Sequence, residues 1–360
     1  MGLRYPPAVI WDTIVIGGGA IGIAATDALA RRGAKVLCLD RSTIPNTESS
    51  HHGESRIIRL AYFEHPDYVP LLREAYRGWA DLCPEVLIPT GILYAGPERS
   101  EVIQGCLASA TEHGLELERW THASLKDRFP QFDLPPQYTV LWEPTGGVLR
   151  PELAIEFFRQ RAERHDATIH ENEPVTGWTE TSVTTAAAVY ETKSVVLASG
   201  AWLPQTRPDL PLTVSAQSAH WFDCGPGYGP GDFPIFGIQS EEGWFVYGFP
   251  DMGTGLKIAL HDLGPTLDSP RAPHPTCDVR FALPYLGLAD QEPLRSSACM
   301  YTSSPDGNFV LGREGNIVLA SCCSGHGFKF APVLGEAIAD LAQHGESKLP
   351  IAFLNPSRFS

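Results

Sequence analysis

Two histidines and two arginines crowd into one short stretch, Ser50 to Arg59, which reads SHHGESRIIR. The apolar pair Ile57-Ile58 inside it indicates that the segment enters the protein interior and carries its arginines with it. A buried guanidinium must find an anion, because an unpaired buried charge is costly. We therefore expect Arg56 and Arg59 to face a bound cofactor or a carboxylate substrate, with a solvated polar loop as the alternative.

A lysine and a histidine stand close together in residues 255–261, GLKIALH. If this stretch is a strand, Lys257, Ala259 and His261 share one face. Such a pair is unusual on an apolar strand, so it indicates a functional face. A strand that simply faces solvent is the alternative.

Residues 324–330, SGHGFKF, lie between an expected strand and an expected helix. Glycines there allow a close backbone approach, and the start of the helix offers a positive field to a developing anion. A plain glycine loop is the alternative. Cys299, in the stretch CMYT, would by itself be expected in the core, as a lone cysteine usually is.

The element that organises the chain is a strand, a glycine turn and a helix near the N-terminus. An apolar run, Thr13–Ile16, precedes Gly17-Gly18-Gly19-Ala20-Ile21-Gly22, and a helix follows to about Leu29. A second strand ends at Asp40, where a carboxylate can accept hydrogen bonds from a ribose diol. This order predicts a dinucleotide whose pyrophosphate lies at the helix N-terminus, and it fits NAD and FAD equally.

Composition narrows the class of partner. The chain has 360 residues and a formal net charge of −15, which argues against nucleic acid or an anionic membrane as a partner. The eight cysteines form no metal-binding pattern, so we expect reduced thiols and no metal. The first residues lack the features of a signal peptide, and no apolar run is long enough to cross a membrane, which predicts a cytoplasmic protein.

The element pattern predicts an α/β fold with an α+β second domain. Helices are expected at Tyr68–Leu82, Glu101–His113 and Pro151–His165, with strands between them. We expect a Rossmann-like dinucleotide domain and an inserted, mostly antiparallel-sheet substrate domain. The expected boundaries are 1–83, 145–218 and 294–360 for the first domain, and 84–144 and 219–293 for the second.

Six pieces of the chain together resemble the monomeric sarcosine oxidase and N-methyl amino acid oxidase family, within the glycine/D-amino-acid oxidase group. They occur in the family's order and cover nearly the whole chain. The pieces are GGGAIG, SHHGESRIIR, YGFP, GLKIALH, CMYT and SGHGFKF.

The resemblance implies FAD rather than NAD, bound covalently through Cys299 to the 8α carbon of the flavin. It places His52 and Arg56 close to the flavin, and Lys257 near its N5 atom, where a fixed positive charge would promote the reduction of O2. The full set of cofactor-binding residues expected on this basis is Gly17, Gly19, Ala20, Ile21, Gly22, Asp40, Arg41, Ser50, His52, Arg56, Val175, Gly200, Cys299, Gly325, Gly327 and Lys329.

The resemblance also implies a substrate site. Arg59 and Lys329 match the residues that clamp the substrate carboxylate, a task that suits a guanidinium and an ammonium. Tyr247, Tyr301 and His261 match residues that line the pocket beside the amine. The implied reaction oxidises a small carboxylated secondary amine with O2, giving an imine and H2O2, in a monomeric enzyme.

One departure bears on the substrate. Cys322 and Cys323 stand where the family usually carries a glycine and an aromatic residue, which indicates a substrate other than sarcosine. An enzyme that dehydrogenates a cyclic imino acid in natural-product synthesis is therefore one alternative. A flavin-binding module that passes electrons within a larger assembly is another.

Overall fold

The computed structural model describes residues 9–261 and 264–359. The first residues, which bear on the signal peptide, lie outside that range. The chain divides into two compact units, each built from separated segments. Unit 1 comprises Met1–His51, Glu152–Leu212 and Ser304–Ser360, and unit 2 comprises His52–Pro151 and Thr213–Ser303.

Unit 1 is built on a six-stranded sheet, parallel except at one edge. Its four central strands are short and fully buried, as expected for a sheet covered on both faces, while the edge strands are partly exposed. In spatial order they are β10 (Thr168–His170), β3 (Val36–Leu39), β2 (Thr13–Ile16), β14 (Val195–Leu197), β21 (Ile317–Ser321) and β20 (Val310–Glu314).

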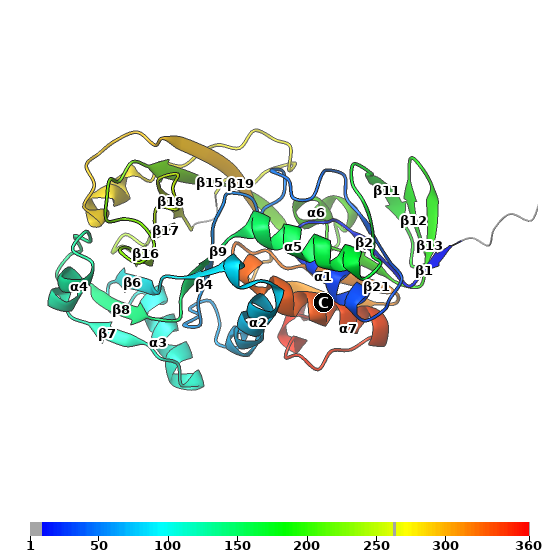
Figure 1. Ribbon diagram of the computed structural model, residues 1–360, viewed down its shortest axis with the longest axis horizontal. Helices are drawn as coiled ribbons and strands as arrows, with labels where there is room; N and C mark the ends of the chain where they lie inside the picture. Colours follow the sequence, from blue (N-terminus) through cyan, green and yellow to red (C-terminus); the bar gives the residue numbers. More distant parts are fainter. Residues whose placement is uncertain (1–8, 262–263, 360) are drawn as a thin grey trace, which may run out of the picture. The chain divides into compact units, whose positions relative to one another are not determined.

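Three long helices and a small sheet complete unit 1 (Figure 1). Helix α1 packs closely on α7, where a Cβ on Gly335 would lie 2.6 Å from the carbonyl oxygen of Ala24. The helices are α1 (Ala20–Arg31), α5 (Pro151–Arg164) and α7 (Ala331–His344), with a short α6 (Leu203–Thr206). The small sheet contains β1 (Ile10–Trp11), β13 (Val189–Thr192), β12 (Ser182–Thr185) and β11 (Val175–Trp178).

Unit 2 is built on an eight-stranded sheet in which every neighbouring pair is antiparallel except β16 and β6. One face of it covers an apolar core that includes Phe222, Phe236 and Ile258. In spatial order the strands are β19 (Arg295–Ser303), β15 (Thr213–Phe222), β18 (Leu256–Leu260), β17 (Phe245–Phe249), β16 (Ile235–Gln239), β6 (Ile92–Gly96), β8 (Thr139–Glu143) and β7 (Glu118–Trp120).

A three-stranded sheet and three helices complete unit 2. Strand β4 holds Arg56 and ends one residue before Arg59, so this sheet positions both arginines of the SHHGESRIIR stretch. The strands are β4 (Arg56–Ile58), β9 (Gly147–Leu149) and β5 (Leu87–Pro89), and the helices are α2 (Tyr68–Leu82), α3 (Glu101–His113) and α4 (His122–Arg128).

The structure confirms the expected α/β class, and the bounds predicted for α2 and α3 match the observed ones. The compact units differ from the expected domains at their edges, because residues 52–83 and the long strands β15 and β19 group with unit 2. The roles assigned to those domains stay a prediction. Within the described residues, no helix is both long and apolar enough to span a bilayer.

Candidate functional site

The turn between β2 and α1 admits only glycine at two of its positions. A Cβ on Gly22 would lie 1.8 Å from the carbonyl oxygen of Gly17. Gly17 itself has φ +102°, and a Cβ there would lie 2.6 Å from the carbonyl oxygen of Ala198, just after β14. The first turn of α1 is thereby held close to the carboxyl ends of two parallel strands, which is where open α/β sheets bind ligands.

The N-terminus of α1 is suited to an anion. Its N-cap residue, Gly19, has no side chain to cap the helix, and no acidic residue stands in the first turn. The N–H groups of Ala20, Ile21 and Gly22 have no partner inside the helix and point along its positive end. This arrangement fits the diphosphate of a dinucleotide.

Asp40 follows β3 and is itself part of the turn. Its Oδ2 accepts a hydrogen bond from the Gly18 N–H at 2.6 Å, and its Oδ1 accepts one from the Ser42 N–H at 2.8 Å. Burial raises the pKa of this carboxyl above its ordinary value, and the two backbone N–H groups oppose that shift. A carboxylate can accept about four hydrogen bonds, so acceptor positions remain for a ribose diol.

The other residues expected at this end of the cofactor also lie in unit 1. The Arg41 guanidinium lies 4.9 Å from the centroid of the Trp202 ring. Trp202 stands two residues after Gly200, which has φ +53°. Val175 begins β11, and the preceding loop meets the end of β3, where the Glu173 N–H donates to the carbonyl oxygen of Asp40 at 2.8 Å. Ser50 is partly buried near the end of the loop that follows Asp40.

A second tight loop in unit 1 joins β21 to α7. A Cβ on Gly327 would lie 1.8 Å from the carbonyl oxygen of Cys322, so the loop turns back on itself. Gly325, with φ +76°, makes the bend, and Cys323 is partly buried beside it. Burial raises the pKa of the Cys322 thiol well above its ordinary value.

Lys329 is buried after this loop, and its ammonium donates to the carbonyl oxygen of His326 at 2.7 Å. His326 is held in turn by the Phe309 ring, 4.6 Å away between centroids. The loop therefore carries a buried cation just before a helix N-terminus, as the SGHGFKF stretch predicts.

In unit 2, strand pairing puts the expected chemical groups on one face of the large sheet. Tyr247 pairs with Ala259, Lys257 pairs with Trp221, and Gln217 pairs with Cys299. Since side chains alternate along strands, the side chains of Tyr247, Lys257 and Cys299 leave the sheet on the same side. Tyr301, two residues beyond Cys299, leaves on that side as well. We call this surface the functional face.

Lys257 is only 4% exposed, so the alternative of a solvent-facing strand is wrong. Its ammonium donates to the carbonyl oxygen of Gly53 at 2.6 Å and to the carbonyl and hydroxyl oxygens of Ser55 at 3.1 and 3.2 Å. It also lies 4.7 Å from the centroid of the Phe249 ring and 5.2 Å from that of Trp221. These groups hold the ammonium with neutral dipoles and aromatic faces.

Arg56 wraps the same turn from the other side. Its guanidinium donates to the carbonyl oxygens of His52 and Ser55 at 2.6 and 2.7 Å. A Cβ built on Gly53 would lie 3.6 Å from the Lys257 ammonium and 3.8 Å from Arg56 Nη1, so the two cations meet over this glycine. The turn thus concentrates positive charge on the functional face.

His52 ties the same turn to the strand that carries Cys299. Its Nε2 lies 2.8 Å from the carbonyl oxygen of Ala298. The Cys299 thiol itself is partly buried. The stretch 50–59 is therefore a structural partner of β19 and β18, and the alternative of a freely solvated loop is wrong.

An aromatic and polar row runs across the functional face. The hydroxyl oxygens of Tyr247 and Tyr301 lie 3.4 Å apart, and the Tyr301 hydroxyl lies 3.3 Å from His261 Nδ1. Phe63 packs edge-on against the His261 ring at 6.5 Å between centroids, and Phe249 packs against Tyr247 at 6.0 Å. Burial raises the pKa of the Tyr247 hydroxyl, so this hydroxyl keeps its proton at physiological pH.

Arg59 lies at one end of this row. Its guanidinium lies 4.4 Å from the centroids of both the Tyr62 and Phe63 rings, and the residue as a whole is 4% exposed. Its Nη2 donates to both carboxylate oxygens of Glu64 at 2.6 Å. The expected anion partner of this buried arginine is therefore present within the chain itself.

The residues around the predicted site were not all predictable. Glu64, Phe63 and Trp221 contact the predicted cations, yet none of the three belongs to a motif. Glu143, fully buried, also props the segment after Arg59, because its carboxylate accepts from the N–H groups of Leu60 and Ala61 at 2.6 and 2.9 Å. The acidic residues that follow SHHGESRIIR were the available signal for Glu64.

Comparison with known proteins places this geometry in a family. Residues 12–341 match the family model described as FAD dependent oxidoreductase, DAO. The chain is 35% identical to a monomeric sarcosine oxidase of Bacillus sp. (strain NS-129), with 97% of both chains covered. It is 32% identical to an N-methyl-L-tryptophan oxidase of Yersinia pestis, covering 97% of this chain and 99% of the relative.

Solved structures share the fold. The open form of NikD, described as an unusual amino acid oxidase essential for nikkomycin biosynthesis, matches with a TM-score of 0.82 at 24% identity, over 96% of this chain and 97% of that one. An L-proline dehydrogenase from P. horikoshii also reaches a TM-score of 0.82, at 23% identity and 98% coverage of both chains. With nearly full-length relatives above 30% identity, the chain belongs to the DAO family of FAD-dependent oxidoreductases, in the group of monomeric sarcosine oxidases and N-methyl amino acid oxidases.

Proposed function

We propose that this protein is an FAD-dependent oxidase of N-methyl or cyclic secondary amino acids. The observation that carries the proposal is the functional face of unit 2, where Arg59, the His261–Tyr301–Tyr247 row and Lys257 follow one another through aromatic contacts. The carboxylate of an amino acid requires a cation such as Arg59, and its amine requires hydrogen-bonding groups such as those of the row. The reduction of O2 requires a fixed positive charge such as that of Lys257. The sarcosine and N-methyltryptophan oxidases among the relatives support the same class of substrate.

Bound FAD would supply the redox chemistry, a two-electron oxidation of the amine to an imine with O2 as the final acceptor. In unit 1, the glycine turn, the start of α1 and Asp40 would hold its diphosphate and ribose. In unit 2, Arg56 and His52 would contact the flavin, and the Cys299 thiol would hold it covalently. The protein's contribution is position and electrostatic field.

Arg59, in unit 2, would bind the substrate carboxylate; Lys329, in unit 1, keeps the carboxylate-binding role that the resemblance implies. The guanidinium of Arg59 is already held flat between two rings and against Glu64, which fixes its orientation. A substrate carboxylate would take over or share this cation with Glu64. Because the Glu64 carboxylate competes for the same guanidinium, the substrate would bind more weakly than it would to an Arg59 without that partner.

His261, Tyr301 and Tyr247 would receive the amine. Because the row contains no carboxylate, it has no group to stabilise a protonated amine, and we infer that the substrate binds as the free base. The hydroxyls and the imidazole can hydrogen-bond to the neutral nitrogen without removing a proton from it. Lys257 would then stabilise the negative charge that develops as O2 is reduced.

The experiment that tests the proposal measures O2 uptake by the purified, flavin-loaded chain with three sets of compounds. These are N-methyl amino acids, the same amino acids without the methyl group, and cyclic secondary amino acids. We expect uptake with secondary amines, H2O2 in equal amount, and formaldehyde from the N-methyl set alone. A ring-oxidised product from the cyclic set without formaldehyde would favour the cyclic imino acid alternative, and no uptake with any compound would overturn the oxidase proposal.

The covalent link has its own test. We expect the yellow chromophore to remain with the chain after denaturation, the mass to rise by one FAD, and a Cys299→Ser variant to release the colour. Colour that leaves the wild-type chain on denaturation would exclude the thioether while leaving non-covalent FAD intact. A monomeric state and a cytoplasmic location remain predictions from the sequence.

A further inference from the structure

Unit 2 contains a second cluster of reactive side chains, on the opposite side of the large sheet from the functional face. Ser218 and His220 alternate with Gln217 and Trp221 along β15, so their side chains leave by the other face. Ser296, which pairs with His220 on β19, lies on that side too. Cys277 completes the group, and we call these four residues the Cys277 cluster.

The four side chains form one hydrogen-bonded chain. Ser218 Oγ lies 3.2 Å from Cys277 Sγ and 3.0 Å from His220 Nε2, while His220 Nδ1 lies 2.8 Å from Ser296 Oγ. The backbone N–H of Cys277 also donates to Ser218 Oγ at 3.1 Å. A serine hydroxyl can donate once and accept twice, so Ser218 joins the thiol to the imidazole directly.

Two arrangements of the proton satisfy this chain. In one, the thiol donates to Ser218, Ser218 donates to Nε2, and Nδ1–H donates to Ser296. In the other, the proton has moved through Ser218 to Nε2, which leaves a thiolate that accepts from Ser218 and an imidazolium. A thiol paired with a histidine in this way is an activated nucleophile.

The charges near the imidazole are few and identifiable. Burial lowers the pKa of His220, and the carboxylate of Asp278 opposes that shift. Asp278 is itself engaged by the Arg280 guanidinium, at 2.9 Å between Oδ2 and Nη2, and this pairing lowers its pKa to about 2. His220 is therefore neutral at physiological pH, so one of its ring nitrogens is a hydrogen-bond acceptor and the proton reaches it only as the thiol reacts.

Solvent exposure distinguishes Cys277 from the two relay residues, Ser218 and His220. Ser218 and His220 are 4% and 5% exposed, so neither can meet a solute. Cys277 is only partly buried. Cys277 is therefore the thiol-bearing residue of the cluster that is partly open to solvent, and the buried Ser218 hydroxyl lies 3.2 Å from its sulfur.

We propose that Cys277 is a modification site for hydroperoxides, H2O2 in particular, with Ser218 and His220 as the relay that activates its thiol. The thiolate sulfur attacks one oxygen of H2O2, an S–O bond forms and the O–O bond breaks. The leaving hydroxide takes the proton held by His220, returned through Ser218, and becomes water. Sulfur is oxidised by two electrons to a sulfenic acid and the peroxide is reduced by two.

The chain supplies a matched control thiol in the same unit. Cys224 is also partly buried, but its sulfur lies 3.9 Å from a carboxylate oxygen of Asp251. Burial, with help from that carboxylate, raises the pKa of Cys224 to about 11, so at neutral pH it stays a thiol. The two cysteines are both partly buried, but one contacts a serine–histidine pair and the other a carboxylate, which makes the ratio of the two rates informative.

The test treats the intact protein with H2O2 in the presence of dimedone, which traps sulfenic acids, and follows each cysteine by peptide mass spectrometry. We expect the Cys277 adduct to form on the order of tenfold faster than the Cys224 adduct, or more. Because the peroxide is added and no amine is present, the result does not depend on the proposed oxidase activity. Equal rates at the two cysteines in the wild-type protein would overturn the proposal without any variant.

Variants then test the relay. Ser218→Ala should remove most of the rate advantage of Cys277, whereas Ser218→Thr, which keeps the hydroxyl, should retain it. His220→Gln keeps a polar side chain but cannot accept the proton, and it should flatten the pH dependence of Cys277 labelling near neutral pH. If Ser218→Ala and Ser218→Thr label alike, the hydroxyl is not a relay and the proposal fails.

Discussion

Lys257 is held by the carbonyl oxygens of Gly53 and Ser55 and by aromatic faces, none of which carries a charge. If its role is to stabilise charge on reduced oxygen, Lys257→Met should slow the reaction of the reduced enzyme with O2 on the order of 10²–10³-fold. The anaerobic reduction of the enzyme by the amine should change far less. Stopped-flow absorbance separates the two half-reactions.

The matched control for Lys257→Met is Lys126→Met, which removes an exposed lysine of unit 2 that is paired loosely with Asp133 at 3.6 Å. This variant should leave both half-reactions unchanged. Equal losses in both half-reactions of Lys257→Met would instead indicate that the buried lysine only supports the fold of the turn.

Arg59 and Glu64 lead to a prediction of opposite signs. Arg59→Ala removes a charge-assisted contact to the substrate carboxylate, which typically costs about 2–5 kcal/mol, so KM should rise roughly 30-fold or more. Glu64→Gln keeps a side chain of the same shape but removes the competing negative charge, so KM should fall. Steady-state kinetics with one carboxylated amine measures both.

If both of these variants raise KM, Glu64 orients Arg59 rather than competing with the substrate. If neither changes KM, Arg59 does not bind the carboxylate. Thermal unfolding of each variant checks that the loop still folds.

At the scale of single residues, the sequence predicted which charged side chains belong to the site but not which groups of the chain contact their charges. The apolar pair after Arg56 predicted correctly that Arg59 is buried, whereas Arg56 is only partly buried. The partner of Arg59 is Glu64, five residues away in a loop, a spacing that no regular element gives a meaning. Likewise, the rings of Phe249 and Trp221 reach Lys257 only because β17 and β15 both flank β18.

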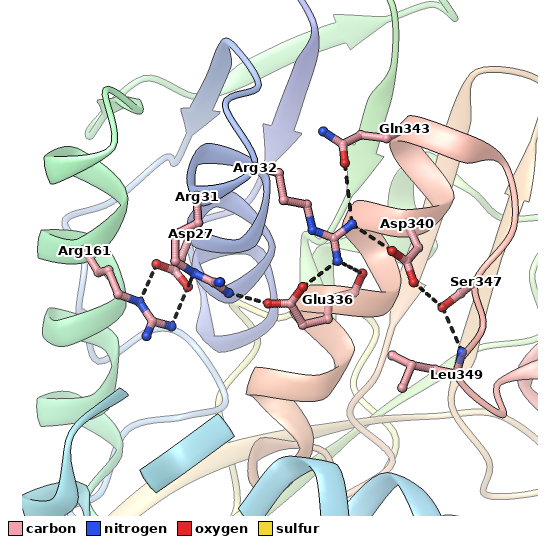
Figure 2. Close-up of polar contacts among 9 residues, drawn as sticks. All are labelled: Asp27, Arg31, Arg32, Arg161, Glu336, Asp340, Gln343, Ser347 and Leu349. Carbon is pink, nitrogen blue, oxygen red and sulfur yellow. Dashed lines mark hydrogen bonds and ion pairs between the residues drawn. The ribbon is translucent and has the colours of Figure 1, made fainter. Parts of the chain in front are cut away.

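At the scale of secondary-structure elements, an ion-pair network with the buried carboxylate of Asp27 at its centre holds helix α1 in place, and with it the glycine turn. Asp27 is 1% exposed in its side chain and accepts from Arg161 of α5 at 2.8 Å through each carboxylate oxygen (Figure 2). Arg31 contacts both Asp27 and Glu336 of α7, and Arg32 pairs with Asp340 at 2.7 Å. Figure 2 shows α1 tied in this way to the helices on either side.

Asp27→Asn should therefore lower the free energy of unfolding by about 1.5–3 kcal/mol, because it removes the charge-assisted hydrogen bonds to the Arg161 guanidinium. Urea unfolding measures the change. The control is Lys193→Gln, which removes an exposed ion pair with Asp12 and should cost no more than about 1 kcal/mol. Equal effects of the two variants would show that the network adds no more to stability than a surface pair does.

Elements with a clear hydrophobic period were predictable, and those without one were not. Helices α2 and α3 show it, and their ends agree with the prediction. Strands β15 and β19 read TVSAQSAHWF and RSSACMYTS, where small and polar residues hide the alternation. Their strand state comes from long antiparallel pairing with each other, a non-local contact that sequence pattern does not report.

For the molecule as a whole, acid stability should depend on a contact near the C-terminus. Burial disfavours the Asp306 carboxylate, but hydrogen bonds from Arg358, Ser304 and the Asn308 N–H outweigh this and hold the pKa of Asp306 well below its ordinary value. A group whose folded pKa is lowered stabilises the fold above its unfolded pKa, about 3.9, and loses that contribution as pH falls below it.

Asp306→Asn should accordingly be less stable than the wild type at pH 7, and the gap should narrow below about pH 4. Asp40 and Glu143 contribute with the opposite sign, because burial raises the pKa of each and their protonated forms are favoured in the fold. Comparing the variant with the wild type at each pH cancels these contributions. A gap that does not change with pH would contradict the assigned role of Asp306.

The most direct test of the account is the anaerobic reaction of the flavin-loaded protein with an N-methyl amino acid and with its unmethylated counterpart. We predict that the methylated compound bleaches the flavin absorbance, that the counterpart bleaches it far more slowly, and that air restores the colour with one H2O2 per turnover. If the protein binds FAD but neither compound bleaches the flavin, even at the highest concentration that dissolves, the claim that this chain oxidises secondary amino acids is contradicted.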